Sequence, residues 1–548
     1  MLGKLLVLVT YIIAMLGLGL YIRGRVHDSP TEYFLAGRRL GLFVLLGSMA
    51  ATNFSAFTVF GASGAGYLHG LAFFPIMGFG TGFMALTFWL IGKRVNQLGR
   101  LHELVTPSEL VQHRYGSRPL SGLFALIMVV FTIPYLALQP MAGGYVLNQL
   151  VGLPQAAGAG IVTLVILAYT LRGGLRSVAW TDTLQGIIMI VMLAAALVMA
   201  AEHHGGFTAA MGKALQAEPE LFSRPGGMGK FGPGIWLSYI LLWFFCDPMF
   251  PQLFQRFYTA RDEKALQRTM LLYPLICTVV FAMPVLLGVL GRLDFPGLHG
   301  KEADAIVPML MTGIGGDVMG ALVLTAGLAA LMSTMDSQLL TLSSIFTRDV
   351  YPFFTGGRTG SSTVGRVFVC CLAAAGYAMA INPPGSILKI ATQTFTGLAV
   401  LFPTIFCGLY LERPRPLPAL ASILAGEAAM VWFALAGPGD LSVLPAIPVM
   451  GVAFGAYFTV HLFSGAGFAW QWSGTSRKWA ISFGLLFLAA CDYWQWGDAR
   501  PVFLGLPGWI WYFVGLSAVQ TFLMWRMCRE ENGRCVDSGN QYYIEQAQ

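Results

Sequence analysis

The sequence predicts an all-α protein that crosses a lipid bilayer many times. Hydrophobic residues make up 56% of the 548 positions, and charged residues make up only 11%, against roughly 25% in an average soluble domain. Mean hydropathy is +0.67. So few charges cannot cover the surface of a water-soluble core. This composition excludes an ordinary cytosolic enzyme, a disordered chain and a disulfide-rich secreted protein.

Fifteen stretches are long and apolar enough to be membrane helices, which need about 20 such residues each. The first shows no cleavage site and is expected to be a retained helix. The stretches at 156–171 and 367–381 are short, so a count of thirteen stays open. The expected spans are 2–22, 42–68, 71–92, 121–150, 156–171, 180–201, 234–255, 269–291, 317–346, 367–381, 386–411, 417–436, 441–464, 479–496 and 506–525.

The distribution of basic residues predicts the orientation in the membrane. Of the 33 lysines and arginines, 25 fall in one alternating set of loops and 8 in the other. The set of 25 includes Arg256, which we expect in a cytoplasmic loop. Because cytoplasmic loops carry the excess of basic residues, the N-terminus is expected outside and the C-terminus inside. Both fifteen and thirteen spans satisfy this arrangement, and the polar tail 529–548 becomes cytoplasmic.

The sequence contains little evidence for nucleic-acid binding, for a metal or disulfide framework, or for an enzyme. The net charge of +7 comes with no basic run that contains interleaved aromatics, so we expect no nucleic-acid partner. The eight cysteines form no CxxC pair, which argues against a metal or disulfide framework. Motifs for ATP binding or hydrolytic catalysis are missing. An intramembrane enzyme and a membrane sensor therefore remain minor alternatives to a carrier.

Polar residues inside apolar spans are costly, so they indicate function or helix packing. The span 42–68 contains the run from Ser48 to Ala56 and then Gly61, Gly64 and Gly66. One interpretation is an unwound helix whose free carbonyls coordinate a cation. The other is a packing seam of small residues with hydroxyls bonded to their own helix.

Two further spans carry carboxylates at membrane depth. In 234–255, Asp247 lies beside Pro248 and Pro251, which interrupt the helical hydrogen bonds. In 317–346, Ser333, Asp336 and Ser337 share one helical face. Oxygen atoms on one face suit a hard cation, although a polar face toward other helices is the alternative. Asp182 at the start of 180–201 would join such a site only if it faces that helix.

Four stretches resemble the sodium:solute symporter family. They are Tyr33 to Arg39; Gly173-Gly174-Leu175 with Trp180-Thr181-Asp182 and Gln185-Gly186; Gln255-Arg256 with Ala260 and Asp262; and Leu328 to Tyr351. Their order and spacing match the family from about residue 30 to 412. The resemblance implies a core of five plus five inverted-repeat helices, as in the bacterial leucine transporter. It divides the chain into an extra helix (1–30), a transport core (31–412), about four peripheral helices (413–528) and the tail (529–548).

The resemblance also implies site residues. The family's main sodium site maps onto Ala51, Phe54, Ala330, Ser333 and Thr334. A second cation site found in some relatives maps onto Asp182, Ser333, Asp336 and Ser337, and Asp336 stands where close relatives often have a small hydroxyl residue. The solute-binding candidates beside the broken helices are Asn53, Ser55, Gln139, Asp247 and Gln393.

These inferences predict a secondary transporter in a bacterial inner membrane. It would import a small organic solute together with sodium by alternating access. A monocarboxylate ranks first, ahead of an amino acid, pantothenate or a sugar. Coupling to protons through Asp336 is the nearest alternative. Sodium is the expected coupling ion, no other cofactor or metal is expected, and the oligomeric state stays open.

Overall fold

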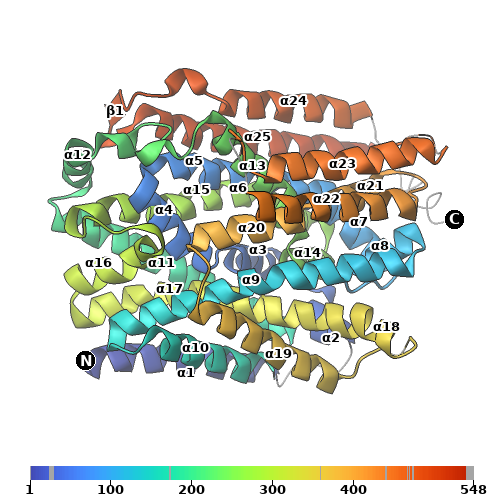
Figure 1. Ribbon diagram of the computed structural model, residues 1–548, viewed down its shortest axis with the longest axis horizontal. Helices are drawn as coiled ribbons and strands as arrows, with labels where there is room; N and C mark the ends of the chain where they lie inside the picture. The colour runs from blue at the N-terminus through green and yellow to red at the C-terminus, as the bar shows by residue number, and fades with distance from the viewer. Residues whose placement is uncertain are drawn as a thin grey trace.

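The protein is a bundle of helices that run along the long axis of the molecule (Figure 1). The computed structural model describes residues 2–23, 30–171, 174–357, 359–437, 441–465, 467, 469–471 and 474–537. Three parts of the predictions lie outside the described residues. They are Gly173 of the second matching stretch, residues 24–29 of the expected extra helix 1–30, and the tail from residue 538 onward.

Helices account for nearly all of the regular structure. The first half of the chain forms α1 (Leu2–Arg23), α2 (Pro30–Leu35), α3 (Leu42–Asn53), α4 (Ala62–His69), α5 (Phe73–Pro75), α6 (Thr81–Met84), α7 (Arg94–Leu101), α8 (Pro107–Tyr115), α9 (Arg118–Val151), α10 (Gln155–Thr170), α11 (Leu175–His203), α12 (Phe207–Ala217), α13 (Pro233–Cys246) and α14 (Pro251–Thr259). The second half forms α15 (Glu263–Asp294), α16 (Ile306–Ile314), α17 (Gly316–Ile345), α18 (Tyr351–Phe354), α19 (Ser362–Ile381), α20 (Ile387–Ala399), α21 (Phe402–Tyr410), α22 (Pro416–Ala436), α23 (Ala446–Phe463), α24 (Gly474–Ala490) and α25 (Gly508–Asp537), with the hairpin β1 (Val502–Phe503) and β2 (Leu506–Pro507) before α25.

All fifteen expected spans fall on helical segments, with changed boundaries. By length and apolarity, ten described helices can cross a membrane, or eleven if the bent pair of α13 and α14 forms one span. α24 ends at Ala490, before the end of the expected span 479–496. α25 continues to Asp537, past the start of the expected tail at 529. Polar residues do not by themselves end a helix, because each further residue adds one backbone hydrogen bond to a helix that has already formed.

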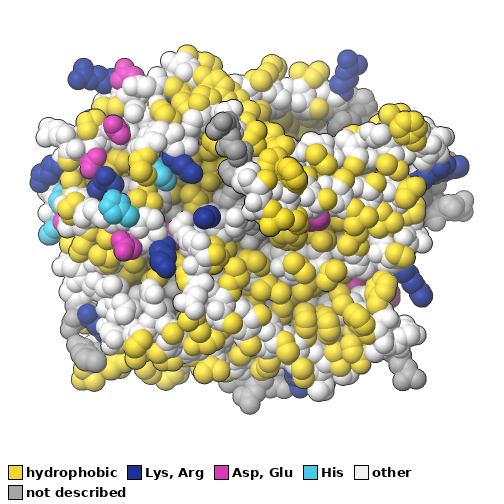
Figure 2. Space-filling view, in the orientation of Figure 1, with side chains coloured by type: hydrophobic (Ala, Val, Ile, Leu, Met, Phe, Trp, Pro, Cys, Tyr) yellow, Lys and Arg dark blue, Asp and Glu magenta, His cyan; other side chains and the backbone are white. Residues whose placement is uncertain are grey.

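The two ends of the bundle differ in the loops that they carry. The connections that we expect outside lie near α12, α16 and β1 at the left of Figure 1, where α1 also begins, and the expected inside connections near α8 and α18 lie at the right. On the face shown in Figure 2, charged and histidine side chains gather toward the ends, and hydrophobic side chains dominate the band between them. This pattern fits a membrane slab across the middle of the molecule.

The broken helices lie inside the bundle, and unbroken helices surround them. α3 contacts α11, α14, α15 and α17, so the first broken segment is enclosed on several sides. α1 packs along α11 and α17, while α22 packs on α23 and α24 packs on α25. In Figure 1, α1 and the pair α24 and α25 lie at opposite sides of the bundle.

A buried ion pair joins the loop before α13 to the segment before α25. Arg224 donates from Nη2 to Oδ2 of Asp492 over 2.8 Å, and both side chains have no solvent exposure. The guanidinium also faces the rings of Trp496, Trp509 and Phe513. A buried ion pair needs such additional contacts to offset the cost of removing two charges from water.

The closest helix packing in the core joins α4 to α15. A Cβ atom on Gly66 would lie 2.5 Å from the carbonyl oxygen of Val285, and one on Gly288 would lie 2.1 Å from that of Ser63. Since both obstacles are backbone atoms, the helices can approach this closely only with glycine at these positions.

We predict that Gly288→Ala lowers the stability of the folded protein by about 1 to 3 kcal/mol, because the added methyl group forces the two backbones apart. Thermal unfolding of the purified protein in detergent measures this effect. Gly451→Ala on α23 is the matched control, since its Cβ would meet no atom within 4 Å. An equal effect of both changes would contradict the packing role of Gly288.

Candidate functional site

The first broken helix supplies exposed backbone groups in the middle of the bundle. α3 ends at Asn53, Phe54 adopts φ −81° and ψ 82°, and a π-helical turn begins at Phe57. This confirms the expected unwinding within 42–68. The packing alternative also holds for the following turns, because a Cβ on Gly61 or Gly64 would lie within 3 Å of Ile387 or Asp304.

Side chains satisfy the first amide groups after the break. The backbone N–H of Ala56 donates to Oε1 of Gln139 over 3.1 Å, and that of Phe57 donates to Oγ of Ser55 over 3.1 Å. Tyr135 donates its hydroxyl to the same Ser55 oxygen over 3.1 Å. Because water does not reach this depth, these bonds are what make the break tolerable. Gln139 and Ser55 therefore hold the backbone here.

α17 directs two hydroxyl groups at the carbonyls of the broken helix. Ser333 Oγ lies 2.9 Å from the carbonyl oxygen of Ala51 and 3.1 Å from that of Ala330. Thr334 Oγ1 lies 3.1 Å from the carbonyl oxygen of Thr52 and 3.2 Å from that of Ala330. Five neutral oxygen atoms thus converge between α3 and α17, which is the donor type that hard cations prefer.

This cluster contains four of the five residues predicted for the main sodium site. The described contacts include none between the Phe54 carbonyl and the α17 hydroxyls, and Thr334 reaches Thr52 instead. Sequence reasoning missed Thr52. Thr52 contributes its backbone carbonyl oxygen, which every residue type carries, so only the geometry of the break identifies it.

An arginine lies in the predicted second cation site. Asp182 on α11 accepts from Nη2 of Arg256 over 2.9 Å, from Ser48 over 2.8 Å and from Ser337 over 3.2 Å. Arg256 also donates to Ser337 over 2.6 Å, and its side chain has no solvent exposure. The assignment of Arg256 to a cytoplasmic loop is therefore wrong. It lies on α14, and Pro251 before it was a signal that a new buried helix begins there.

Asp336 lies next to this ion pair without joining it. Its carboxylate is fully buried, and neither oxygen has a hydrogen-bond partner among the described residues. Asp182, Arg256 and Tyr169 are its nearest polar neighbours. The structure therefore brings Asp182 and Ser337 together around a guanidinium and leaves Asp336 beside them.

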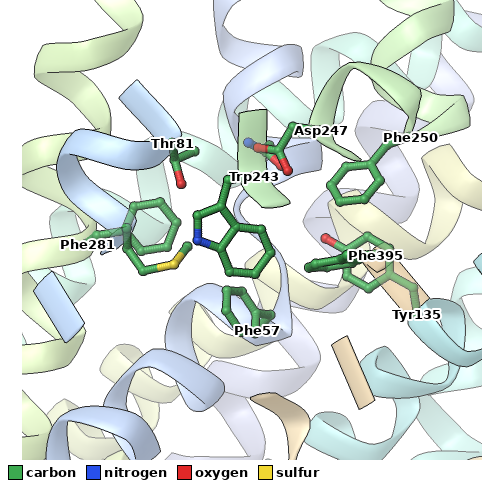
Figure 3. A pocket seen from close by; sticks show the side chains of 10 residues that line it. Phe57, Thr81, Tyr135, Trp243, Asp247, Phe250, Phe281 and Phe395 are labelled. Carbon is green, nitrogen blue, oxygen red and sulfur yellow. The ribbon is translucent and has the colours of Figure 1, made fainter. Parts of the chain in front are cut away.

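A small cavity lies beside the break, and Figure 3 shows it from close by. Of the five predicted solute-binding residues, Asn53 and Asp247 line it. Ser55 and Gln139 lie behind Tyr135 in the hydrogen bonds around the break, and Gln393 is exposed on α20. The lining consists of Asn53, Phe57, Met77, Thr81, Tyr135, Trp243, Asp247, Phe250, Phe281 and Phe395.

The aromatic lining comes from five separate parts of the chain, and sequence reasoning did not identify it. Phe395 contacts the rings of Tyr135, Trp243 and Phe250 at centroid distances of 4.9, 5.3 and 4.7 Å. The sequence contains 39 phenylalanines, and aromatic residues in membrane helices usually pack against other helices. Only the three-dimensional arrangement separates the cavity rings from the rest.

At the outer end of α4, a buried carboxylate connects two parts of the core. Asp304 accepts from the backbone N–H of Ile387 over 2.9 Å, at the first turn of α20. A Cβ on Gly64 of α4 would lie 2.6 Å from the same carboxylate. Asp304 lies in the connection between α15 and α16, outside the apolar spans. Burial raises the pKa of Asp304 from 3.8 to about 7.

Two interrupted helices inside a bundle, with an oxygen cluster on one side and a cavity on the other, define a secondary transporter. A family model described as the sodium:solute symporter family matches residues 33–426, and the chain belongs to this family. It is thus a membrane transport protein and not an enzyme, and sodium is its coupling ion.

Curated relatives cover most of the chain. The sodium/pantothenate symporter of Haemophilus influenzae is 28% identical over 78% of this chain and 89% of its own length. The sodium/pantothenate symporter of Escherichia coli is 27% identical over 84% and 96%. The high-affinity proline transporter PutP of Bacillus subtilis is 26% identical over 77% and 90%.

Solved structures show the fold. A sodium-coupled sialic acid symporter in an outward-open state superimposes with a TM-score of 0.70, at 18% identity, over 84% of this chain and 98% of that chain. A nucleobase-cation-symport-1 family transporter gives a TM-score of 0.56 at 12% identity, over 79% and 96%. The expected five-plus-five fold of the leucine-transporter type is confirmed.

We predict that Asp304→Asn changes how stability depends on pH. With a pKa raised to about 7, the folded protein binds a proton that the unfolded chain releases near pH 4. Stability therefore falls as the pH rises from about 4 to 7. Asparagine still accepts from Ile387 but does not titrate.

Thermal unfolding between pH 5 and 8 tests this expectation. The melting temperature of the wild type should fall more steeply with rising pH than that of Asp304→Asn. Glu220→Gln, an exposed carboxylate at the same end of the molecule, should match the wild type. Parallel curves for the wild type and Asp304→Asn would refute the role of Asp304.

Proposed function

We propose that this protein imports a small organic solute into a bacterial cell together with sodium bound between α3 and α17. The observation that supports the proposal is the convergence of Ser333 and Thr334 on the carbonyls of Ala51 and Thr52. We assign Ala51, Ala330, Ser333 and Thr334 to the sodium site and retain Phe54 as the remaining ligand.

The binding of sodium and the binding of the solute are coupled because both ligands bind beside the same broken helix, α3. Sodium bridges a helix of the first repeat to a helix of the second, and it fixes the break in one geometry. The solute cavity includes Asn53, next to Thr52, whose carbonyl oxygen contacts Thr334 of the proposed sodium site. A solute that needs this geometry binds more tightly once sodium is in place, and the effect is reciprocal. The loaded core then turns to face the cytoplasm.

We place the N-terminus outside, the C-terminus inside and the protein in the inner membrane. The loops with the excess of basic residues gather at one end of the bundle (Figure 1). The relatives that cover most of the chain are bacterial. We assign transport to residues 31–412 and a peripheral role to α1 and to the helices of 413–528.

The identity of the solute remains a prediction. The sequence favours a monocarboxylate, with an amino acid, pantothenate or a sugar as alternatives. The relatives' names refer to pantothenate and proline, and both molecules carry a carboxylate.

The cluster around Asp336 supports a second candidate function. Two buried carboxylates, Asp182 and Asp336, lie near the single guanidinium of Arg256, which forms an ion pair with Asp182. When both are ionised, the buried cluster has an excess negative charge that needs a further monovalent cation or a proton. A cation at Asp182, Asp336 and Ser337 would be a second sodium, and a proton on Asp336 would make the protein a proton-coupled carrier.

We predict that Ser333→Ala combined with Thr334→Ala abolishes the response to sodium. Each lost contact to a charged group costs about 1.5 to 3 kcal/mol, so the sodium affinity should fall roughly a hundredfold or more. Sodium titration of thermal stability, with potassium at equal ionic strength as a reference, measures the affinity. Thr325→Ala on the same helix is the control, because its hydroxyl bonds only to its own helix. An unchanged sodium response in the double variant would refute the site.

We predict that Asp336→Asn retains sodium-dependent stabilisation, with a midpoint within about threefold of the wild type, because Asp336 is not a ligand of the proposed main site. The midpoint is measured at pH 6, 7 and 8 in both proteins. A pH dependence that occurs in the wild type and disappears in Asp336→Asn would instead favour the proton-coupled carrier.

A further inference from the structure

The cavity beside the break combines aromatic walls with a single ionisable group. Rings from Phe57, Tyr135, Trp243, Phe250 and Phe395 surround much of the space, and the Asp247 carboxylate borders it (Figure 3). The lining contains no lysine, arginine or histidine. In the part of the chain that the structure describes, no basic side chain forms an ion pair with Asp247.

The local fold fixes the position of this carboxylate. Asp247 begins a short 3₁₀ turn between α13 and α14, whose axes differ by 55°. Pro248 and Pro251 prevent the helix from continuing through this point. Asp247 is 4% exposed, and the Cys246 thiol donates to it over 3.4 Å. A thiol is a weak donor, so this contact does not replace a positive charge.

The backbone near the cavity offers little to a negatively charged solute. The N-terminus of a half-helix normally attracts anions through its unsatisfied N–H groups. After this break, Gln139 and Ser55 already accept from the amides of Ala56 and Phe57. The amides of Thr58 and Val59 donate to the Ser55 carbonyl. These four amides after the first break are thus occupied, and the one ionisable side chain in the cavity lining is acidic.

An aromatic enclosure with a carboxylate matches the chemistry of an ammonium group. Ring faces attract cations, most strongly where water is excluded, and a buried carboxylate without a positively charged partner gains most from an opposite charge. We propose that the solute carries a positively charged amine or quaternary ammonium group, which binds at Asp247 while its apolar part lies among the rings. This inference rests on the proposed transport function, but it replaces the monocarboxylate and pantothenate, which carry no amine, with an amine-bearing solute.

The experiment compares probes of similar size that differ in charge. Thermal stability of the purified full-length protein is measured in sodium and in potassium with three sets of compounds. The sets are prolinamide, proline and cyclopentanecarboxylate; phenethylamine, phenylalanine and 3-phenylpropionate; and choline, glycine betaine and isovalerate. We expect amine-bearing members of at least one set to stabilise the protein and the member with only a carboxylate to have no effect.

Substitution of the carboxylate provides the second part of the test. Asp247→Asn should weaken binding of the stabilising amine at least tenfold, and Asp247→Glu should retain the preference for amines. Glu427→Gln, an intramembrane carboxyl on α22 that does not line the cavity, should bind the amine like the wild type. Stabilisation by sodium alone reports whether each variant is folded.

Several results would overturn the proposal. They are stabilisation by the carboxylate-only members, no stabilisation by any amine, and unchanged amine binding in Asp247→Asn. Loss of the sodium response in Asp247→Asn with amine binding intact would assign the carboxylate to the coupling ion instead. If sodium does not stabilise the wild type, the proposed sodium-coupled function is contradicted. Amine binding is also measured in potassium, so that result is distinguishable from a failure of the amine proposal.

Discussion

The interruption of α3 at Phe54 to Ala56 is the constraint on which the other features depend. A chain inside a membrane must satisfy every backbone amide and carbonyl from within the protein. Here Gln139 and Ser55 bond the amides after the break, and the hydroxyls of Ser333 and Thr334 contact the carbonyls before it. The backbone after the interruption therefore bonds to α9 through Gln139, and the backbone before it contacts α17 through Ser333 and Thr334.

In the proposed function, this division gives the ion and the solute neighbouring but distinct sites. The carbonyl side presents neutral oxygen atoms, which suit a small hard cation. The amide side is already bonded by side chains, and the cavity next to it gets its character from aromatic rings and Asp247. A shift of α3 relative to α17 alters both environments, which is the physical requirement for coupling two ligands.

Much of the fold and part of the site could be predicted from the sequence, because hydrophobic spans and polar residues within them have strong signals. Ser333, Thr334 and Asp247 stand out for this reason. Arg256 was misplaced because it closes a short amphipathic helix that resembles a loop when only charge is counted. Gln393 lies outside the cavity because it is two residues, about 200° of helical rotation, away from Phe395, which lines the cavity. Thr52 contributes only its backbone, which no sequence pattern reveals.

The contact between Arg224 and Asp492 gives the last helices a mechanical role. Arg224 precedes α13, the first half of the second broken segment, and Asp492 precedes α25. Neither charge can leave the other without being stranded in an apolar environment. The segment that leads into α13 is thus held against the segment that leads into α25, whereas the other end of α13 meets the break at Asp247. The C-terminal helices therefore anchor the start of the second broken segment.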